Sequence, residues 1–199
     1  MKRVVLIAAL AAAACDQPPV REIQAAEQQV ERARTVGAER FAPERFKQAQ
    51  AALTLARQRL EGRDYRGALS AANDASESAR VAIENTGPAQ TAARNAAEMG
   101  IGEVRTMLDR AATERTAAVR AGVPRGSLAA LDARAQRASQ QLAGAVLQLG
   151  AGNLDYVEPL LAELRTEVTP LPDLYRDART RWQAQHSPRA RRPARRPSR

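Results

Sequence analysis

Alanine at helical spacing is the feature that most narrows what this chain can fold into. The 199 residues include 44 alanines. In the clearest segment the apolar positions alternate in steps of three and four, at Leu128, Leu131, Ala135, Ala138, Leu142, Ala145 and Leu149. This spacing gathers side chains on one face of an α-helix. Because aromatic residues make up only 3% of the chain and Val and Ile are sparse, a sheet is disfavoured, and we predict an all-α fold.

The same spacing, interrupted by Gly and Pro, predicts where the helices lie. We expect helices over residues 20–36, 43–60, 65–84, 88–121, 127–149, 154–168 and 174–182. The expected buried seams of four of them are Ile23, Ala26, Val30 and Ala33; Phe46, Ala49, Leu53, Ala56 and Leu60; Tyr65, Ala68, Ala72, Ala75, Ala79 and Ala82, with Ile83; and Leu154, Val157, Leu161, Leu164 and Val168. We expect Asp64 to cap the third helix, a break at residues 85–88 (Asn-Thr-Gly-Pro) after it, and a weakened stretch near Gly100 and Gly102.

Turn residues recur in a similar order in the two halves of the chain. Each half has a Gly-then-Pro turn, a heptad helix and a Gly-rich turn, and the Gly-rich turns end in Asp64-Tyr65 and Asp155-Tyr156. This order indicates an internal duplication, although Gly and Pro turns recur in any helical protein. We expect Ala-rich antiparallel helical hairpins, TPR-like or in an elongated bundle, as two degenerate copies. The expected parts are a hairpin domain at 20–85, a second hairpin unit at 88–170, a short helix at 171–185 and a disordered Arg/Pro tail at 186–199.

The N-terminus has the pattern of a bacterial export signal. Lys2 and Arg3 precede an apolar run over residues 4–14, which is too short to span a bilayer. The chain's only cysteine, Cys15, follows three alanines, in a pattern that resembles a lipobox. We expect residues 1–14 to be a signal peptide, Cys15 to carry lipid, and residues 15–19 to be a spacer. The alternative is conventional cleavage after alanine; which membrane holds the anchor stays open.

The positive charge lies in the last residues of the chain. The net charge is +9, but residues 4–188 are close to neutral, because the last eleven residues carry six arginines: Arg189, Arg191, Arg192, Arg195, Arg196 and Arg199. Such a tail can bind anionic lipid head groups or an anionic polymer. A solvated tail without a ligand is the alternative. Export argues against a specific nucleic-acid partner.

The residues needed for common catalytic and metal sites are scarce in this sequence. His186 is the only histidine, which excludes a His-based triad and a histidine-ligated metal site. Carboxylates at helical steps beside arginines are interpreted as solvated ion pairs. We therefore predict no enzyme activity, no metal and no cofactor. The expected function is that of a lipid-anchored, periplasm-facing envelope protein that acts as a structural or protein-interaction module with an unknown envelope partner.

One stretch of the first half is similar to a known bacterial family. It runs Gly37-Ala-Glu-Arg-Phe-Ala-Pro-Glu-Arg-Phe, then through alanine heptads to Glu61-Gly-Arg-Asp-Tyr65 and on to Ala75. It resembles the domain of unknown function 4398 family over about residues 20–82, and the second half matches weakly. The resemblance implies helical hairpins borne on envelope lipoproteins. It brings no catalytic residues, and on a TPR-like reading Tyr65 and Ala68 pack into the preceding helix.

Overall fold

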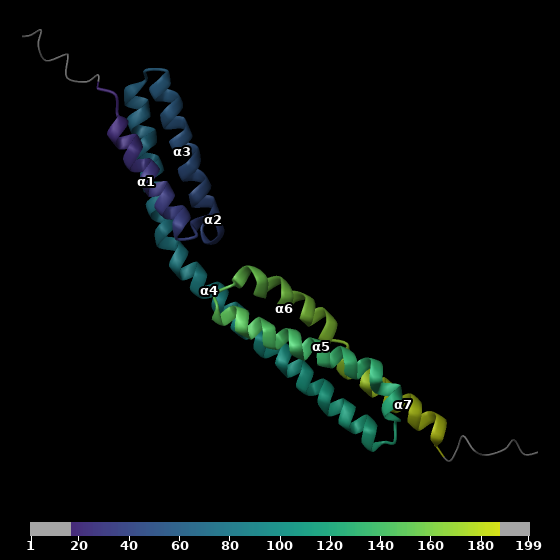
Figure 1. The fold of residues 1–199 in the computed structure, drawn as a ribbon. Coiled ribbons are helices and arrows are strands. Elements are labelled where there is room, and N and C mark those ends of the chain that lie inside the picture. Colours follow the sequence, from purple (N-terminus) through teal and green to yellow (C-terminus); the bar gives the residue numbers. More distant parts are fainter. Residues whose placement is uncertain (1–16, 188–199) are drawn as a thin grey trace, which may run out of the picture. The chain divides into compact units, whose positions relative to one another are not determined.

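The computed structural model describes residues 17–187 and is all-α over that range (Figure 1). Its helices are α1 (Val20–Thr35), α2 (Ala38–Phe41), α3 (Pro43–Glu61), α4 (Tyr65–Arg120), α5 (Arg125–Gly150), α6 (Leu154–Val168) and α7 (Leu171–His186). The prediction of an all-α fold is confirmed. The chain divides into two compact units, Met1–Ala92 (unit 1) and Ala93–Arg199 (unit 2), and the division falls inside α4.

Unit 1 is a bundle of α1, α2, α3 and the first part of α4, held by a core of small side chains. The core comprises Ile23, Ala26, Val30 and Ala33 of α1, Ala38 and Ala42, Phe46, Ala49, Leu53 and Ala56 of α3, and Ala68, Ala71, Ala72, Ala75, Ala79 and Ala82 of α4. The predicted seams are therefore confirmed, with Leu60 and Ile83 partly buried against the core. Ala68 is buried as expected, and Tyr65 is half-buried.

Unit 2 contains the rest of α4 with α5, α6 and α7, and its core holds larger side chains. The largest fully buried ones are Tyr175, Leu128, Leu164, Leu171, Val104, Val157 and Val168. Helix α5 packs against both α6 and α7. The predicted seam of α6 is buried throughout, whereas in α5 Leu131 and Ala135 are only half-buried. The side chain of Asp132, which lies between them, has polar partners described below.

The predicted break after the third helix is wrong, because α4 is one continuous helix of 56 residues that includes Pro88. Proline lacks the N–H that would donate to the carbonyl four residues earlier, and this usually ends or kinks a helix. Here the hydroxyl of Thr86 donates to the Ala82 carbonyl oxygen at 2.8 Å, inside the helix. Gln90 Nε2 donates to the Val36 carbonyl oxygen at 3.1 Å and ties this stretch to the turn after α1. The contact between Gln90 and Val36 and the helix formers on both sides favour a helical conformation here.

The predicted weakening near Gly100 and Gly102 is also not observed. A Cβ placed on Gly100 would lie 2.9 Å from Arg165 Nη2 and 3.1 Å from Leu161 Cδ1. The glycine therefore gives room for α6 to approach α4 within unit 2, while a Cβ on Gly102 would meet nothing within 4 Å. Glycine inside a helix costs about 1 kcal/mol relative to alanine, which the surrounding packing can offset.

Residues in the left-handed region follow four of the helices. Three are glycines: Gly37 (φ 89°), Gly122 (φ 90°) and Gly152 (φ 83°). The fourth is Arg63 (φ 60°), the only non-glycine with positive φ among residues 17–187. The amide of Arg63 donates to the Leu60 carbonyl oxygen at 3.0 Å and that of Asp64 to Arg59 at 2.8 Å, the pair of bonds that also closes the turns at Gly122 and Gly152. Arg63 thus occupies a position that strongly favours glycine.

The turn after Arg63 begins α4 with the predicted cap. The amide of Gly67 donates to Asp64 Oδ1 at 3.0 Å, so the Asp64 side chain satisfies one of the free amides in the first turn of the helix. This confirms the prediction that Asp64 caps the third expected helix.

Replacing Pro88 tests whether a proline inside α4 lowers the free energy of unfolding. Pro88→Ala restores a helix N–H and should raise the free energy of unfolding by about 2–3 kcal/mol, because proline is disfavoured by roughly that amount inside a helix. Pro43→Ala is the matched control: Pro43 lies in the first turn of α3, where proline is favourable. Urea denaturation measures both. Equal effects of the two substitutions would contradict a helix that runs through Pro88.

Candidate functional site

The residues that the sequence indicates as functional lie outside the part of the chain that the structure describes. Cys15 and the six tail arginines lie beyond residues 17–187, so lipidation and anionic binding stay predictions. His186, expected at the start of the tail, is instead the last residue of α7. Its ring stacks on Trp182 one helical turn earlier, with ring centroids 3.7 Å apart, and its Nδ1 lies 2.9 Å from the Trp182 carbonyl oxygen. These contacts extend α7 beyond the expected end at residue 182.

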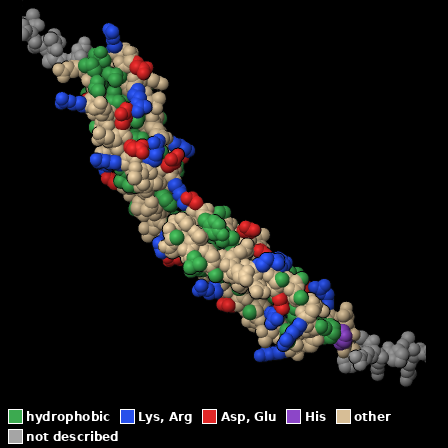
Figure 2. All heavy atoms as spheres, viewed as in Figure 1, with side chains coloured by type: hydrophobic (Ala, Val, Ile, Leu, Met, Phe, Trp, Pro, Cys, Tyr) green, Lys and Arg blue, Asp and Glu red, His purple; other side chains and the backbone are tan. Residues whose placement is uncertain are grey.

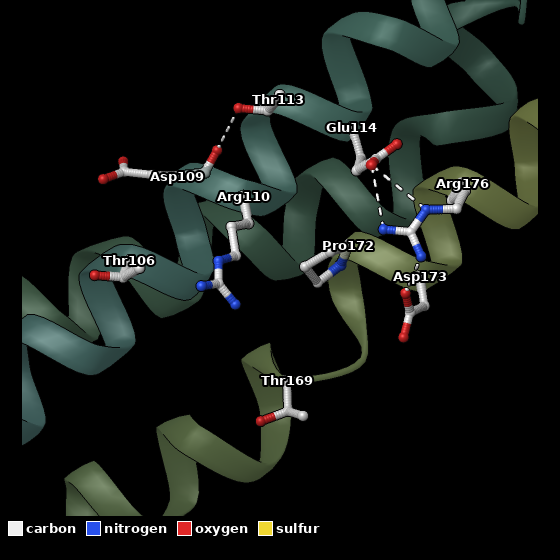
Figure 3. Close-up of a pocket in the computed structure, with 9 residues that line it drawn as sticks. All are labelled: Thr106, Asp109, Arg110, Thr113, Glu114, Thr169, Pro172, Asp173 and Arg176. Atoms are coloured by element: carbon white, nitrogen blue, oxygen red, sulfur yellow. Dashed lines mark hydrogen bonds and ion pairs between the residues drawn. The ribbon is translucent and has the colours of Figure 1, made fainter.

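A polar groove lies in unit 2 between α4 and the start of α7 (Figure 3). Its volume is about 450 Å³. The lining residues are Thr106, Asp109, Arg110, Thr113 and Glu114 of α4, Thr169 after α6, and Pro172, Asp173 and Arg176 of α7. The α4 residues recur at helical spacing, so one face of α4 forms one wall. The chain turn from α6 to α7 forms the other.

Ion pairs inside this groove join α7 to α4. Arg176 contacts Glu114 Oε1 through Nη2 at 3.2 Å and Asp173 Oδ1 through Nη1 at 2.7 Å. Arg179 Nη1 lies 3.3 Å from Glu114 Oε2. The Glu114 carboxylate raises the pKa of Arg176 through its hydrogen bond and its charge. Two arginines of α7 therefore hold one carboxylate of α4, which is a clamp between helices.

Arg110 is a positively charged residue of the groove that takes no part in this clamp. Its side chain extends from α4 into the groove, which Asp109 also lines (Figure 3). Within residues 17–187 Arg110 makes no ion pair. The hydroxyls of Thr106 and Thr113 donate to carbonyls of α4, each at 2.9 Å. The groove can therefore accept a carboxylate of a partner at Arg110.

A second polar cluster lies under α7, around the phenol of Tyr175. Tyr175 is fully buried, and its hydroxyl donates to Asp132 Oδ1 of α5 at 2.8 Å. Arg115 of α4 donates to both carboxylate oxygens of Asp132, at 2.7 and 2.8 Å. A hollow of about 390 Å³ is lined by these three residues with Leu108, Ala112, Ala135, Gln136 and Ser139. The cluster joins α4, α5 and α7 at one point.

The electrostatics of this cluster suit packing rather than proton transfer. Hydrogen bonding to Arg115 lowers the pKa of the Asp132 carboxyl, so this group stays ionised. Burial, and then the hydrogen bond to Asp132, raise the pKa of the Tyr175 phenol well above its ordinary value. At neutral pH the phenol therefore stays protonated and donates to an ionised carboxylate. A tyrosine that acts as a base needs the opposite shift.

The rest of the described surface is a mixture of charges of both signs. Figure 2 shows Lys and Arg side chains interspersed with Asp and Glu over the visible face. Residues 17–187 hold no group of three or more His, Cys, Asp or Glu placed to bind a metal ion. None of the helices that the structure describes has the length and apolar character needed to cross a bilayer.

Tyr175→Phe tests the cluster. The variant removes a hydrogen bond from the buried phenol to a partly buried carboxylate and should lower the free energy of unfolding by about 1–3 kcal/mol at neutral pH. Tyr156→Phe is the matched control, since Tyr156 is 55% exposed. Because the Asp132 pKa is depressed in the folded state, its contribution is present above the ordinary carboxyl pKa of about 4 and is lost as the pH falls below it. The gap between wild type and Tyr175→Phe should therefore shrink in acid; a gap independent of pH would contradict the cluster.

Comparison with protein-family models, with curated proteins and with solved structures finds no match to this chain. The resemblance to the domain of unknown function 4398 family therefore stays an expectation from the sequence. Three features of the chain itself bear on its function. They are the cysteine behind its N-terminal apolar segment, its two helical units and the groove along α4.

Proposed function

We propose that this protein is a lipid-anchored component of a bacterial cell envelope, facing the periplasm, and that it acts as a non-catalytic structural or protein-interaction module. Its helices serve as Ala-rich antiparallel hairpins, TPR-like in plan and in two degenerate copies. The partner is another envelope protein. The anchor is a lipid on Cys15.

The single observation that carries the proposal is the position of Cys15. It is the chain's only cysteine, and it stands directly behind an apolar segment preceded by two basic residues. An export signal accounts for the apolar segment, and a lipobox accounts for the cysteine at its end. A cysteine with no second cysteine in the chain forms no internal disulfide. Lipidation therefore accounts for both features together.

The arrangement of the helices supports a role in interaction. Helix α4 contributes residues to both units, so a single element connects two helical surfaces. In unit 2 the groove beside α7 offers Arg110 to a partner, while Glu114 and Arg176 are already paired within the chain. A carboxylate on a partner protein is the group that best fits this guanidinium.

Removal of the anchor tests the proposal. In cells of the source bacterium, Cys15→Ala should move the protein from the membrane fraction to the soluble fraction, and intact-mass analysis should show wild-type protein carrying acyl chains. The exposed substitution Gln28→Ala is the control and should leave fractionation unchanged. Wild-type protein without acyl chains would contradict the proposal. Unacylated protein that leaves the membrane at high salt would favour the alternative, in which the six tail arginines bind an anionic polymer or lipid head groups.

A further inference from the structure

We propose that the end of unit 1 formed by the first turn of α1 and the α3–α4 turn docks on the phospholipid head groups of the membrane that holds the anchor, with Arg63 as its main phosphate contact. This inference rests on the proposed lipidation of Cys15. It adds an orientation of unit 1 relative to the membrane. It also assigns a ligand to Arg63, whose backbone conformation is unfavourable.

The tether between Cys15 and the first helix is short. Five residue steps separate Cys15 from Val20, where α1 begins. A fully extended chain covers at most about 18 Å over that distance. Pro18 and Pro19 restrict the spacer further, and the Val20 amide donates to the Pro18 carbonyl oxygen at 2.8 Å. A lipid on Cys15 therefore keeps the start of α1 near the head groups.

The α3–α4 turn lies at the same end of unit 1 as the start of α1 (Figure 1). The ion pair between Arg57 Nη2 and Glu27 Oε1, at 2.8 Å, joins the later part of α3 to α1 and agrees with this arrangement. The turn, at residues 62–64, is therefore held near the same membrane surface.

This end of unit 1 carries several exposed arginines. Arg21, Arg63 and Arg66 are exposed, and none of them makes an ion pair within the described part of the chain. Arg59 lies 3.9 Å from Asp64, and the acidic groups Glu22 and Glu61 partly balance the arginines. The end is thus weakly cationic. Once the tether brings it close, a weak attraction to anionic head groups is enough to favour docking.

Arg63 has a backbone conformation that suits glycine better than arginine. The equivalent positions after α1, α4 and α5 are glycine, and Gly62 stands directly before Arg63. An arginine at φ 60° is unfavourable for stability, and residues kept in such conformations are concentrated where function needs them. Here the left-handed turn places an unpaired guanidinium at the tip of the loop. Guanidinium is the side-chain group best matched to phosphate.

The test measures how close each end of α3 lies to the bilayer. Because acylated Cys15 has no free thiol, a cysteine introduced elsewhere is the only site for a fluorophore. Gln58→Cys labels the end of α3 near Arg63, and Gln48→Cys labels the opposite end of the same helix; both positions are exposed. The acylated full chain is placed in vesicles of phosphatidylcholine, alone or mixed equally with phosphatidylglycerol, that carry a quencher on the lipid head group.

The expected result has three parts. Quenching of the Gln58 probe should exceed that of the Gln48 probe, and the excess should grow with phosphatidylglycerol. Arg63→Gly and Arg63→Gln should each lower the ratio of docked to undocked protein about fivefold, as expected for one basic residue at an anionic surface. Arg63→Gly alone should also raise the melting temperature, because glycine relieves the left-handed conformation. Arg32→Gln, at the far end of α1, should change neither measurement.

Each contrary outcome overturns a different part of the proposal. An N-terminus without acyl chains overturns the proposed function and this inference with it. An acylated protein with equal quenching at the two probes overturns the docking alone. If Arg63→Gly raises the melting temperature but leaves quenching unchanged, docking through Arg63 is wrong and the arginine has no role at the membrane.

Discussion

Close contact between alanine side chains is the constraint on which the bundle of unit 1 depends. All but four of its core residues are alanine, the exceptions being Ile23, Val30, Phe46 and Leu53. An alanine seam lets helix backbones approach closely, but each methyl group removes little surface from water. Stability therefore comes from many small contacts, and a larger side chain in place of a fully buried alanine would have to displace its neighbours. Phe46, 1% exposed, is the one large side chain that this core accommodates in full.

Unit 2 follows a different plan, with larger apolar side chains and a partly buried polar cluster. Tyr175 lies in the core of this unit and is fully buried, so its hydroxyl needs a partner, and Asp132 supplies it. Asp132 in turn accepts hydrogen bonds from Arg115 at both carboxylate oxygens. These hydrogen bonds fix where α7 lies against α4 and α5. The ion pairs of Arg176 and Arg179 with Glu114 also join α7 to α4, on the side of the groove.

Much of the fold could be predicted from local patterns, because the helical period and the turn residues are local properties. The seams of α1, α3 and α6 agree with the structure, and so does the cap at Asp64. The continuity of α4 could not be predicted from residues 85–88: contacts such as that between Gln90 and Val36 join positions 54 residues apart. Asp132 and Tyr175 are 43 residues apart, and neither follows a motif that would have drawn attention to the pair. The groove at Arg110 was missed for the same reason, since its walls come from different helices.

The most direct measurement of the alanine-seam account is thermal unfolding of two leucine variants of α3. Ala49 is fully buried in the seam, and Ala51, two positions along the same helix, is exposed. Ala49→Leu should lower the free energy of unfolding by about 1–3 kcal/mol, the usual cost of forcing a larger side chain into a packed core. Ala51→Leu should leave it almost unchanged. If both variants melt at the wild-type temperature, the helices of unit 1 do not approach closely at their alanines, and the account of how this bundle is held together is wrong.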